Sequence, residues 1–224
     1  MTRNLVIVSA GTSQPSTTRM LADRIAAVSV ERLREMEVTT TVGAVEVAPL
    51  AVEAARALVT GVPSAELEAA IEEIAAADAV IAAAPVYKAG INGLFKSFVD
   101  VLDDDLLIAK PVVLAATAGS SRHALVVDEQ MRSLFAYLRA LTLPTSVFAA
   151  PEDWGAAELG ERIARAATEL AVVIEAQIER GIADRAWSGY RHEFAGNATR
   201  AEQTAANVDF DSPLMRLAAG GRTN

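Results

Sequence analysis

Residues 5–18 read LVIVSAGTSQPSTT, a short apolar run followed by a loop of small and hydroxyl-bearing residues. The β-branched run is typical of a buried parallel strand. After the loop, apolar residues recur at helical spacing from Met20 to Val28. A strand, a hydroxyl-rich loop and a helix in this order favour anion binding, because free backbone N–H groups lie at the positive end of the helix dipole. The stretch therefore predicts a phosphate-binding loop, although a helix entry capped by Ser16 or Thr17 would need only one of these hydroxyls.

The composition limits the classes of protein and partner. The chain has 224 residues, 52 % of them hydrophobic and only 5 % aromatic, which suits one α/β domain with an aliphatic core. A net charge of −9 argues against nucleic acid or an anionic membrane as the main partner. The absence of cysteine excludes disulfides and Cys-based catalytic or metal sites. Without a signal-peptide pattern or an uncharged apolar stretch of transmembrane length, a soluble cytoplasmic protein is expected.

Strand and helix patterns alternate along the chain, and they predict an α/β fold. Five strands alternating with helices indicate a doubly wound, five-stranded parallel sheet with helices on both faces. In such sheets, ligands bind beyond the carboxyl ends of the strands, near the point where the strand order reverses. An acidic run at 103–105 is interpreted as a solvated turn. We expect strands at 4–9, 38–46, 78–84, 111–117 and 145–148, and helices at 17–35, 52–59, from 64 onward, 94–102, 125–141 and 158–180.

Three loops follow strands at these ends, and the hydroxyl-rich loop is the first. The second, PVYKAG at 85–90, begins with Pro85, which is expected to end its strand. Tyr87 offers a flat ring and Lys88 a positive charge, as a planar heteroaromatic ligand requires, although a half-buried tyrosine and a surface lysine fit equally well. The third loop, TAGSSRH at 117–123, has a glycine that either approaches a ligand closely or makes a turn.

Other ligand chemistries lack their motifs in this chain. There is no Gly-x-Gly-x-x-Gly after the first strand, no Gly-Lys-Ser/Thr and no Gly-x-Ser-x-Gly. These absences argue against a dinucleotide Rossmann site, a P-loop and a hydrolase nucleophile elbow. Two histidines without cysteine argue against a zinc site. A planar cofactor that carries a phosphate remains, and FMN fits these loops best.

The same loops resemble those of a known family. PVYK at 85–88 followed by GLFKSFVD at 93–100 looks like the flavin-proximal segment of the NADPH-dependent FMN reductases. AGS at 118–120 is similar to their next loop, and residues 11–18 resemble their phosphate loop. The resemblance covers about residues 3–180 with three motifs in order. Within the family, the chain is similar to reductases of two-component flavin monooxygenase systems, and its length and tail look like the subgroup paired with luciferase-like monooxygenases.

The resemblance implies a flavodoxin-like fold, FMN bound by the three loops, and hydride transfer from NADPH or NADH to flavin N5. Reduced FMN would then serve a luciferase-like flavin-dependent monooxygenase. The resemblance also implies a homodimer or homotetramer. The hydride transfer requires no side chain as an acid or base. Gln14 stands where relatives often carry Arg, which predicts weaker FMN binding. The implied FMN-binding residues are Gly11, Thr12, Ser13, Gln14, Ser16, Thr17 and Thr18 at the phosphate, Pro85, Val86, Tyr87 and Lys88 at the ring, and Thr117, Ala118, Gly119 and Ser120 on its other side.

Three other functions stay open from the residues alone. They are an NAD(P)H quinone or azo reductase with tightly bound FMN, a flavodoxin-like electron-transfer protein, and a non-catalytic interaction protein that acts through its tail. From residue 182 onward, the regular helical pattern gives way to several aromatic residues followed by a polar stretch. We therefore expect a flavin-binding domain at 1–181 and an irregular extension at 182–224 for packing, oligomer or partner contact. Within the extension, 209–217 is predicted to dock on a sister subunit or on the monooxygenase.

Overall fold

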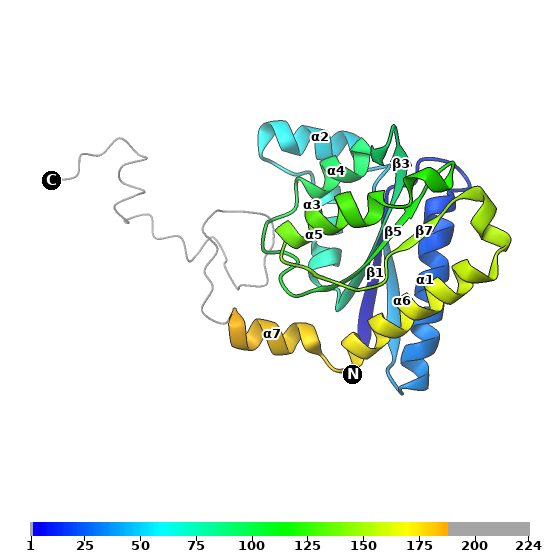
Figure 1. The fold of residues 1–224 in the computed structure, drawn as a ribbon. Helices are drawn as coiled ribbons and strands as arrows, with labels where there is room; N and C mark the ends of the chain where they lie inside the picture. Colours follow the sequence, from blue (N-terminus) through cyan, green and yellow to red (C-terminus); the bar gives the residue numbers. More distant parts are fainter. Residues whose placement is uncertain (1, 188–224) are drawn as a thin grey trace.

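A parallel sheet between two layers of helices forms the body of the protein, as the computed structural model of residues 2–187 shows (Figure 1). The strand order is β2-β1-β3-β5-β6, while β4 pairs antiparallel with β3, and β7 pairs parallel with β5. The order reverses between β1 and β3, so the predicted doubly wound parallel sheet is confirmed. The strands are β1 (Arg3–Ser9), β2 (Thr40–Glu46), β3 (Ala79–Tyr87), β4 (Gly90–Ile91), β5 (Pro111–Thr117), β6 (Leu141–Thr142) and β7 (Val147–Ala149).

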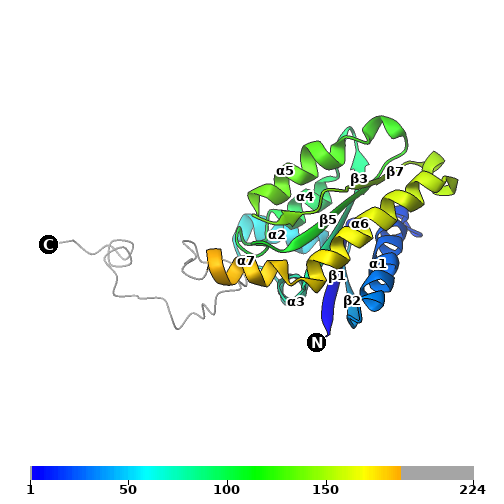
Figure 2. The same ribbon diagram turned by 60° about the horizontal axis from the view of Figure 1, so that its bottom comes forward.

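Helices cover both faces of the sheet. The helices α1 and α6 pack side by side on one face, whereas α3, α4 and α5 cover the other (Figure 1 and Figure 2). None of the helices within residues 2–187 is both long and apolar enough to span a membrane. The helices are α1 (Thr17–Glu35), α2 (Ala51–Thr60), α3 (Ala65–Ala75), α4 (Gly93–Val99), α5 (Arg132–Tyr137), α6 (Ala157–Glu175) and α7 (Ile178–Ala186), with 3-10 turns η1 (Ser121–His123) and η3 (Pro151–Gly155) and a π-helical turn η2 (Val127–Met131).

Alternation along β1 supplies both layers of the core. Leu5 and Ile7 belong to the cluster under α1 and α6, whereas Val6 and Val8 belong to the cluster under α3 and α4. All four side chains are buried, as expected for a strand covered on both faces. The sheet thus holds the end of β1, and the loop after it, between two packed layers.

The strand β3 continues past Pro85, so the prediction that this proline ends the strand is wrong. Pro85 is the last residue of β3 that pairs with β5, opposite Thr117. The strand then runs on to Tyr87 and pairs with β4 instead. A proline removes a single N–H donor, which is tolerated where a strand changes its partner.

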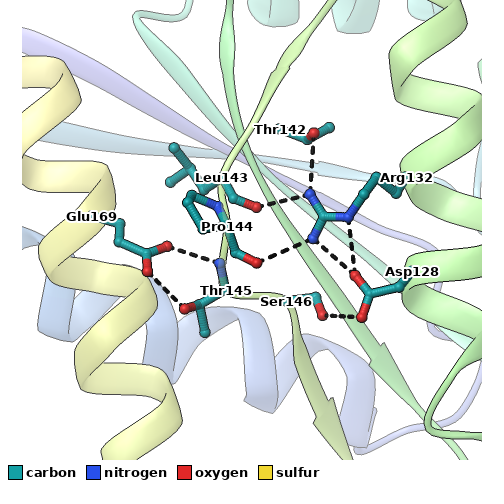
Figure 3. Close-up of polar contacts among 8 residues, drawn as sticks. All are labelled: Asp128, Arg132, Thr142, Leu143, Pro144, Thr145, Ser146 and Glu169. Carbon is teal, nitrogen blue, oxygen red and sulfur yellow. Dashed lines mark hydrogen bonds and ion pairs between the residues drawn. The ribbon is translucent and has the colours of Figure 1, made fainter.

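The sheet has seven strands rather than the predicted five, because β4 pairs with β3 and because β6 precedes β7, the strand that matches the one predicted at 145–148. Both β6 and β7 pair with β5, and residues 143–146 lie between them, with Leu143 N still donating to Val112 O at 3.0 Å. Pro144 has no N–H, and Arg132 of α5 donates to the backbone oxygens of residues 143 and 144 (Figure 3). Glu169 of α6 accepts from the N and Oγ1 atoms of Thr145. Side chains therefore replace ladder partners between these two strands.

Two predicted helices are also interrupted. The helix expected at 125–141 is the π-helical turn η2 followed by the short α5, and Arg139, with φ 57°, directs the chain into β6. The helix expected at 158–180 is divided into α6 and α7 at Gln177, with φ 50°. A residue in the left-handed region breaks a right-handed helix, and neither position carries the glycine that would announce it.

The acidic turn at 103–105 is not solvated as predicted. Asp103 and Asp105 are only 7 % and 4 % exposed, while Asp104 accepts a hydrogen bond from the hydroxyl of Tyr137 at 3.1 Å. The flanking leucines 102, 106 and 107 are buried and draw the turn into the protein.

The last described helix, α7, is attached at the amino-terminal side of the sheet. Lys110, which directly precedes β5, forms an ion pair with Glu179 at 3.4 Å, and the Arg139 guanidinium lies 5.6 Å from the ring centroid of Trp187. The helix crosses the expected domain boundary, so the first part of the extension is helical rather than irregular. Residues 188–224, including the predicted docking segment, lie outside the described residues.

Candidate functional site

The three loops selected from the sequence lie at the carboxyl ends of β1, β3 and β5, beside the reversal of strand order. We call them the phosphate loop (11–18), the β3–β4 hairpin (85–91) and the β5 loop (117–123). The hydroxyls of Thr12 and Tyr87 are 2.7 Å apart. The hydroxyls of Thr18 and Thr117 are also 2.7 Å apart. Side-chain hydrogen bonds thus connect the phosphate loop to both of the other loops.

The phosphate loop exposes hydroxyls at the start of a helix of 19 residues. Ser16 is the N-cap of α1, because its Oγ accepts from the backbone N of Arg19 at 3.2 Å. A Cβ on Gly11 would lie 1.8 Å from Ser16 Oγ, so only glycine leaves this hydroxyl room. Gly11 and Thr18 are buried, Ser16 is half-buried, and the exposed members of the loop are Thr12, Ser13, Gln14, Pro15 and Thr17. Capping thus uses the hydroxyl of Ser16, while Thr12 shares its hydroxyl with Tyr87 and Ser13 Oγ donates to the backbone oxygen of Pro15 at 3.0 Å. Hydroxyls near the positive end of a helix favour an anion.

The predicted site residues of the β3–β4 hairpin are of two kinds, buried and exposed. Pro85 and Val86 are buried, and Val86 packs in the hydrophobic core. Tyr87 and Lys88 are exposed, and Lys88 turns the chain at φ 51°. The first two residues can therefore serve a ligand mainly through their backbone, and the last two through their side chains.

The β5 loop is attached to its neighbours on both sides. Thr117 is buried against Thr18, while Ala118 and Ser120 are half-buried and Gly119 is exposed. Further along, the backbone N of Ser121 donates to Glu152 of η3 at 3.3 Å. The backbone N–H of Glu152 itself, followed by the hydroxyl of Ser121 and more weakly by its backbone N–H, lowers the pKa of the Glu152 carboxyl.

Asn92 contributes a link that was not predicted from the sequence. Its side chain is buried, and Nδ2 donates to the backbone oxygen of Ala10 at 3.0 Å. Its Oδ1 accepts from Phe95 N at 3.2 Å and caps α4. Asn92 thereby fixes the end of the hairpin to the start of the phosphate loop. An asparagine just before an apolar helical run was the available signal.

Arg19 places a positive charge in the first turn of α1. Its Nε donates to Asp23 Oδ1 at 2.7 Å, and its Nη1 donates to Glu46 at the end of β2. Burial lowers the pKa of Arg19, but the bonds to Asp23 and Glu46 outweigh this effect and raise it. Two carboxylates thus balance the guanidinium beside a phosphate loop that has no charged side chain of its own.

A family model described as NADPH-dependent FMN reductase matches residues 3–155. The chain belongs to this family. An FMN reductase (NADPH) from Pseudomonas aeruginosa is 39 % identical over 150 residues, which cover 67 % of this chain and 78 % of that protein. The NADH-dependent FMN reductase SfnE from Pseudomonas putida is 39 % identical over 178 residues, which cover 75 % of this chain and 90 % of that protein. The predicted family and the predicted enzyme class of this reductase are therefore confirmed, with FMN and NAD(P)H as its reactants.

Solved structures share the fold of the reductase. An oxidoreductase from Corynebacterium diphtheriae is 43 % identical with a TM-score of 0.75, covering 77 % of this chain and 97 % of that one. An NADH:FMN oxidoreductase in its apo form is 26 % identical with a TM-score of 0.66, covering 76 % and 89 %. A WrbA-like flavodoxin from Agrobacterium tumefaciens, at 17 % identity and a TM-score of 0.54, covers 78 % and 99 %. This last likeness concerns the fold alone and confirms the flavodoxin-like prediction.

Proposed function

We propose that the reductase binds FMN across the phosphate loop, the β3–β4 hairpin and the β5 loop, and that reduced FMN then leaves for a partner flavin-dependent monooxygenase. The observation that carries this proposal is the pair of 2.7 Å hydroxyl contacts, which joins all three loops beside the reversal of strand order. When bound there, FMN accepts the hydride of NAD(P)H at its N5 atom. The protein's part is to bind and orient both reactants.

Each loop has a separate role in this arrangement. Hydroxyls and backbone N–H groups of the phosphate loop, from Gly11 to Thr18, hold the phosphate. Pro85 and Val86 present backbone groups to the polar edge of the ring, Tyr87 gives it a flat wall, and Lys88 a positive charge. Residues 117–120 close the other side, with Thr117 bonded to Thr18 beneath the site.

The charge balance at the phosphate supports a flavin that exchanges. Gln14 is neutral, and the guanidinium of Arg19 is already paired with Asp23 and Glu46. We therefore expect hydrogen bonds to hold the phosphate. A guanidinium that is already paired with two carboxylates attracts a further anion more weakly than a free one does. FMN bound in this way behaves as a diffusible substrate, as a reductase that supplies a monooxygenase requires.

The partner and the assembly belong to the same proposal. We take the monooxygenase to be luciferase-like and the reductase to be a homodimer or homotetramer, on the basis of the family resemblance. We assign flavin binding to residues 1–181, and subunit or partner contact to the extension at 182–224, which begins within α7. Deletion of 205–224 should lower the mass found by light scattering or weaken coupling to the monooxygenase, and unchanged values of both would contradict this role.

Oxidation of NADPH and of NADH by the purified protein in air, with and without added FMN, tests the central claim. Oxidation that depends on added FMN and saturates with it is expected. Oxidation without added FMN, together with FMN retained through gel filtration, would indicate a reductase with a resident flavin. No oxidation with either nucleotide would overturn the proposed activity.

A further inference from the structure

The turn of the β3–β4 hairpin is built from residues that do not favour it. Lys88 and Ala89 are its two central residues, with φ 51° and 66°, while Tyr87 pairs with Gly90 across the turn. Two consecutive residues at positive φ characterise a type I′ turn, for which Asn-Gly is the preferred sequence. Side chains with a Cβ are strained in the left-handed region. A Lys-Ala turn in this conformation therefore needs support from its surroundings.

Gln130 of η2 contacts the hairpin within this turn and directly after it. Its Oε1 accepts from the backbone N of Ile91 at 3.0 Å, and its Nε2 donates to the backbone oxygen of Ala89 at 3.4 Å. A Cβ on Gly90 would lie 3.1 Å from the same Oε1, so the glycine leaves room for the amide. One half-buried side chain thus satisfies a donor and an acceptor of the hairpin backbone.

The turn of helix that carries Gln130 is itself fixed from another direction. Asp128, two residues earlier, accepts from Nε and Nη2 of Arg132 at 3.0 and 2.8 Å. Its second oxygen accepts from Ser146 Oγ at 3.0 Å (Figure 3). η2 is therefore attached to the β6–β7 connection through Asp128 and to the hairpin through Gln130. A support for a strained turn must be held in this way, because a free side chain would follow the hairpin rather than restrain it.

We propose that Gln130 is a positioning residue that holds Lys88 and Ala89 in the left-handed region and thereby sets the place of Tyr87 at the flavin. The inference rests on the proposed flavin-binding role of the hairpin. Gln130 acts through the hairpin backbone, at Ile91 N and Ala89 O. Its loss releases the turn without removing a group from the flavin site itself.

The test compares Gln130→Ala with Glu129→Ala, its exposed neighbour in η2. Gln130→Ala is expected to raise the FMN dissociation constant, measured by flavin fluorescence, about 3- to 10-fold, the factor associated with one neutral hydrogen bond. In the flavin-free protein, the amide of Ile91 should exchange its hydrogen faster, while the thermal midpoint stays near that of the parent. Adding Ala89→Gly should restore most of the FMN affinity, because glycine adopts positive φ without strain. Glu129→Ala should change neither the FMN dissociation constant nor the exchange rate of the Ile91 amide.

Three results would overturn the role of Gln130. They are an unchanged Ile91 exchange rate in Gln130→Ala, an unchanged FMN dissociation constant, and a loss of affinity that Ala89→Gly fails to restore. Failure of the parent protein to bind FMN would instead overturn the proposed function. The exchange measurement uses flavin-free protein, so it would still decide whether Gln130 holds the hairpin.

Discussion

The side chains of Thr12 and Tyr87 meet at a hydroxyl-to-hydroxyl distance of 2.7 Å, although the two residues are 75 positions apart in the chain. One belongs to the phosphate loop and the other to the β3–β4 hairpin, so this contact sets the distance between the proposed phosphate and ring sites. The pair is exposed. It therefore contributes little to the stability of the fold, and its main effect is on the arrangement of the site.

Two substitutions separate the roles of these hydroxyls. Tyr87→Phe breaks the contact but leaves Thr12 available to the phosphate, and it should raise the FMN dissociation constant by no more than about 5-fold. Thr12→Val also removes a bond to a charged phosphate, worth about 1.5–3 kcal/mol, and should raise it by at least about 10-fold. Riboflavin has no phosphate, so both substitutions should change the riboflavin dissociation constant by the same factor. Equal losses of FMN affinity would contradict the role of Thr12 at the phosphate.

Ser16 is expected to have two functions that a matched helix cap can separate. Ser16→Ala should lower the free energy of unfolding by about 1 kcal/mol through the lost cap, and it should also raise the FMN dissociation constant several-fold. Ser64 caps α3 in the same way, with its Oγ accepting from Leu67 N at 3.3 Å. Ser64→Ala should cost similar stability in a urea titration and leave flavin binding unchanged. Equal flavin affinities in the two variants would remove Ser16 from the phosphate site.

Arg132 should stabilise the protein through the geometry of its guanidinium rather than its charge alone. Arg132→Ala is expected to lower the free energy of unfolding by about 1–3 kcal/mol, because backbone oxygens of residues 143 and 144 lose a charged donor. Arg132→Lys keeps the charge without the planar fork and should recover only part of this loss. The exposed Arg165 of α6 is the control, and its alanine variant should stay within about 0.5 kcal/mol in urea denaturation. Full recovery by lysine would show that geometry is unimportant.

The contact between Ser121 and Glu152 should persist into acid. The pKa of the Glu152 carboxyl is lowered by its own backbone N–H and by Ser121. A carboxyl with a lower pKa in the folded state contributes stability above its unfolded pKa, and this contribution is lost as the pH falls through the folded value. The amide shift of Ser121, followed by NMR, should titrate below the usual range of a glutamate and should not titrate in Glu152→Gln. A midpoint within the usual range would contradict the lowered pKa.

Much of the fold follows from local patterns. The helix expected at 17–35 has these bounds in the structure, because Ser16 caps it and a clear apolar stripe marks its buried face. The strand β1 and the placement of the three loops were predictable for the same reason, since apolar strands and their short connections are local features. The hydroxyl-rich loop also announced the candidate site, although capping and phosphate binding share one sequence pattern.

The remaining features depend on residues distant in the chain. Gln130 contacts Ile91 across 39 positions, and Asn92 contacts Ala10 across 82. No local period encodes such pairs. The strand expected at 145–148 begins only at Val147, because the side chains of Arg132 and Glu169 bond the backbone of residues 143–145. The helix expected at 125–141 ends before Arg139, whose positive φ has no glycine to indicate it.

The division between β6 and β7 has a consequence for how these molecules meet one another. Both strands lie at one edge of the sheet, beside β5. A continuous strand at this edge would offer a row of free backbone donors and acceptors to a strand of another molecule. Arg132 and Glu169 already occupy the backbone of residues 143–145 (Figure 3). The continuous part of this border is therefore limited to the short strands β6 and β7, which leaves another strand little length to pair with, without a proline-rich or lysine-rich border strand.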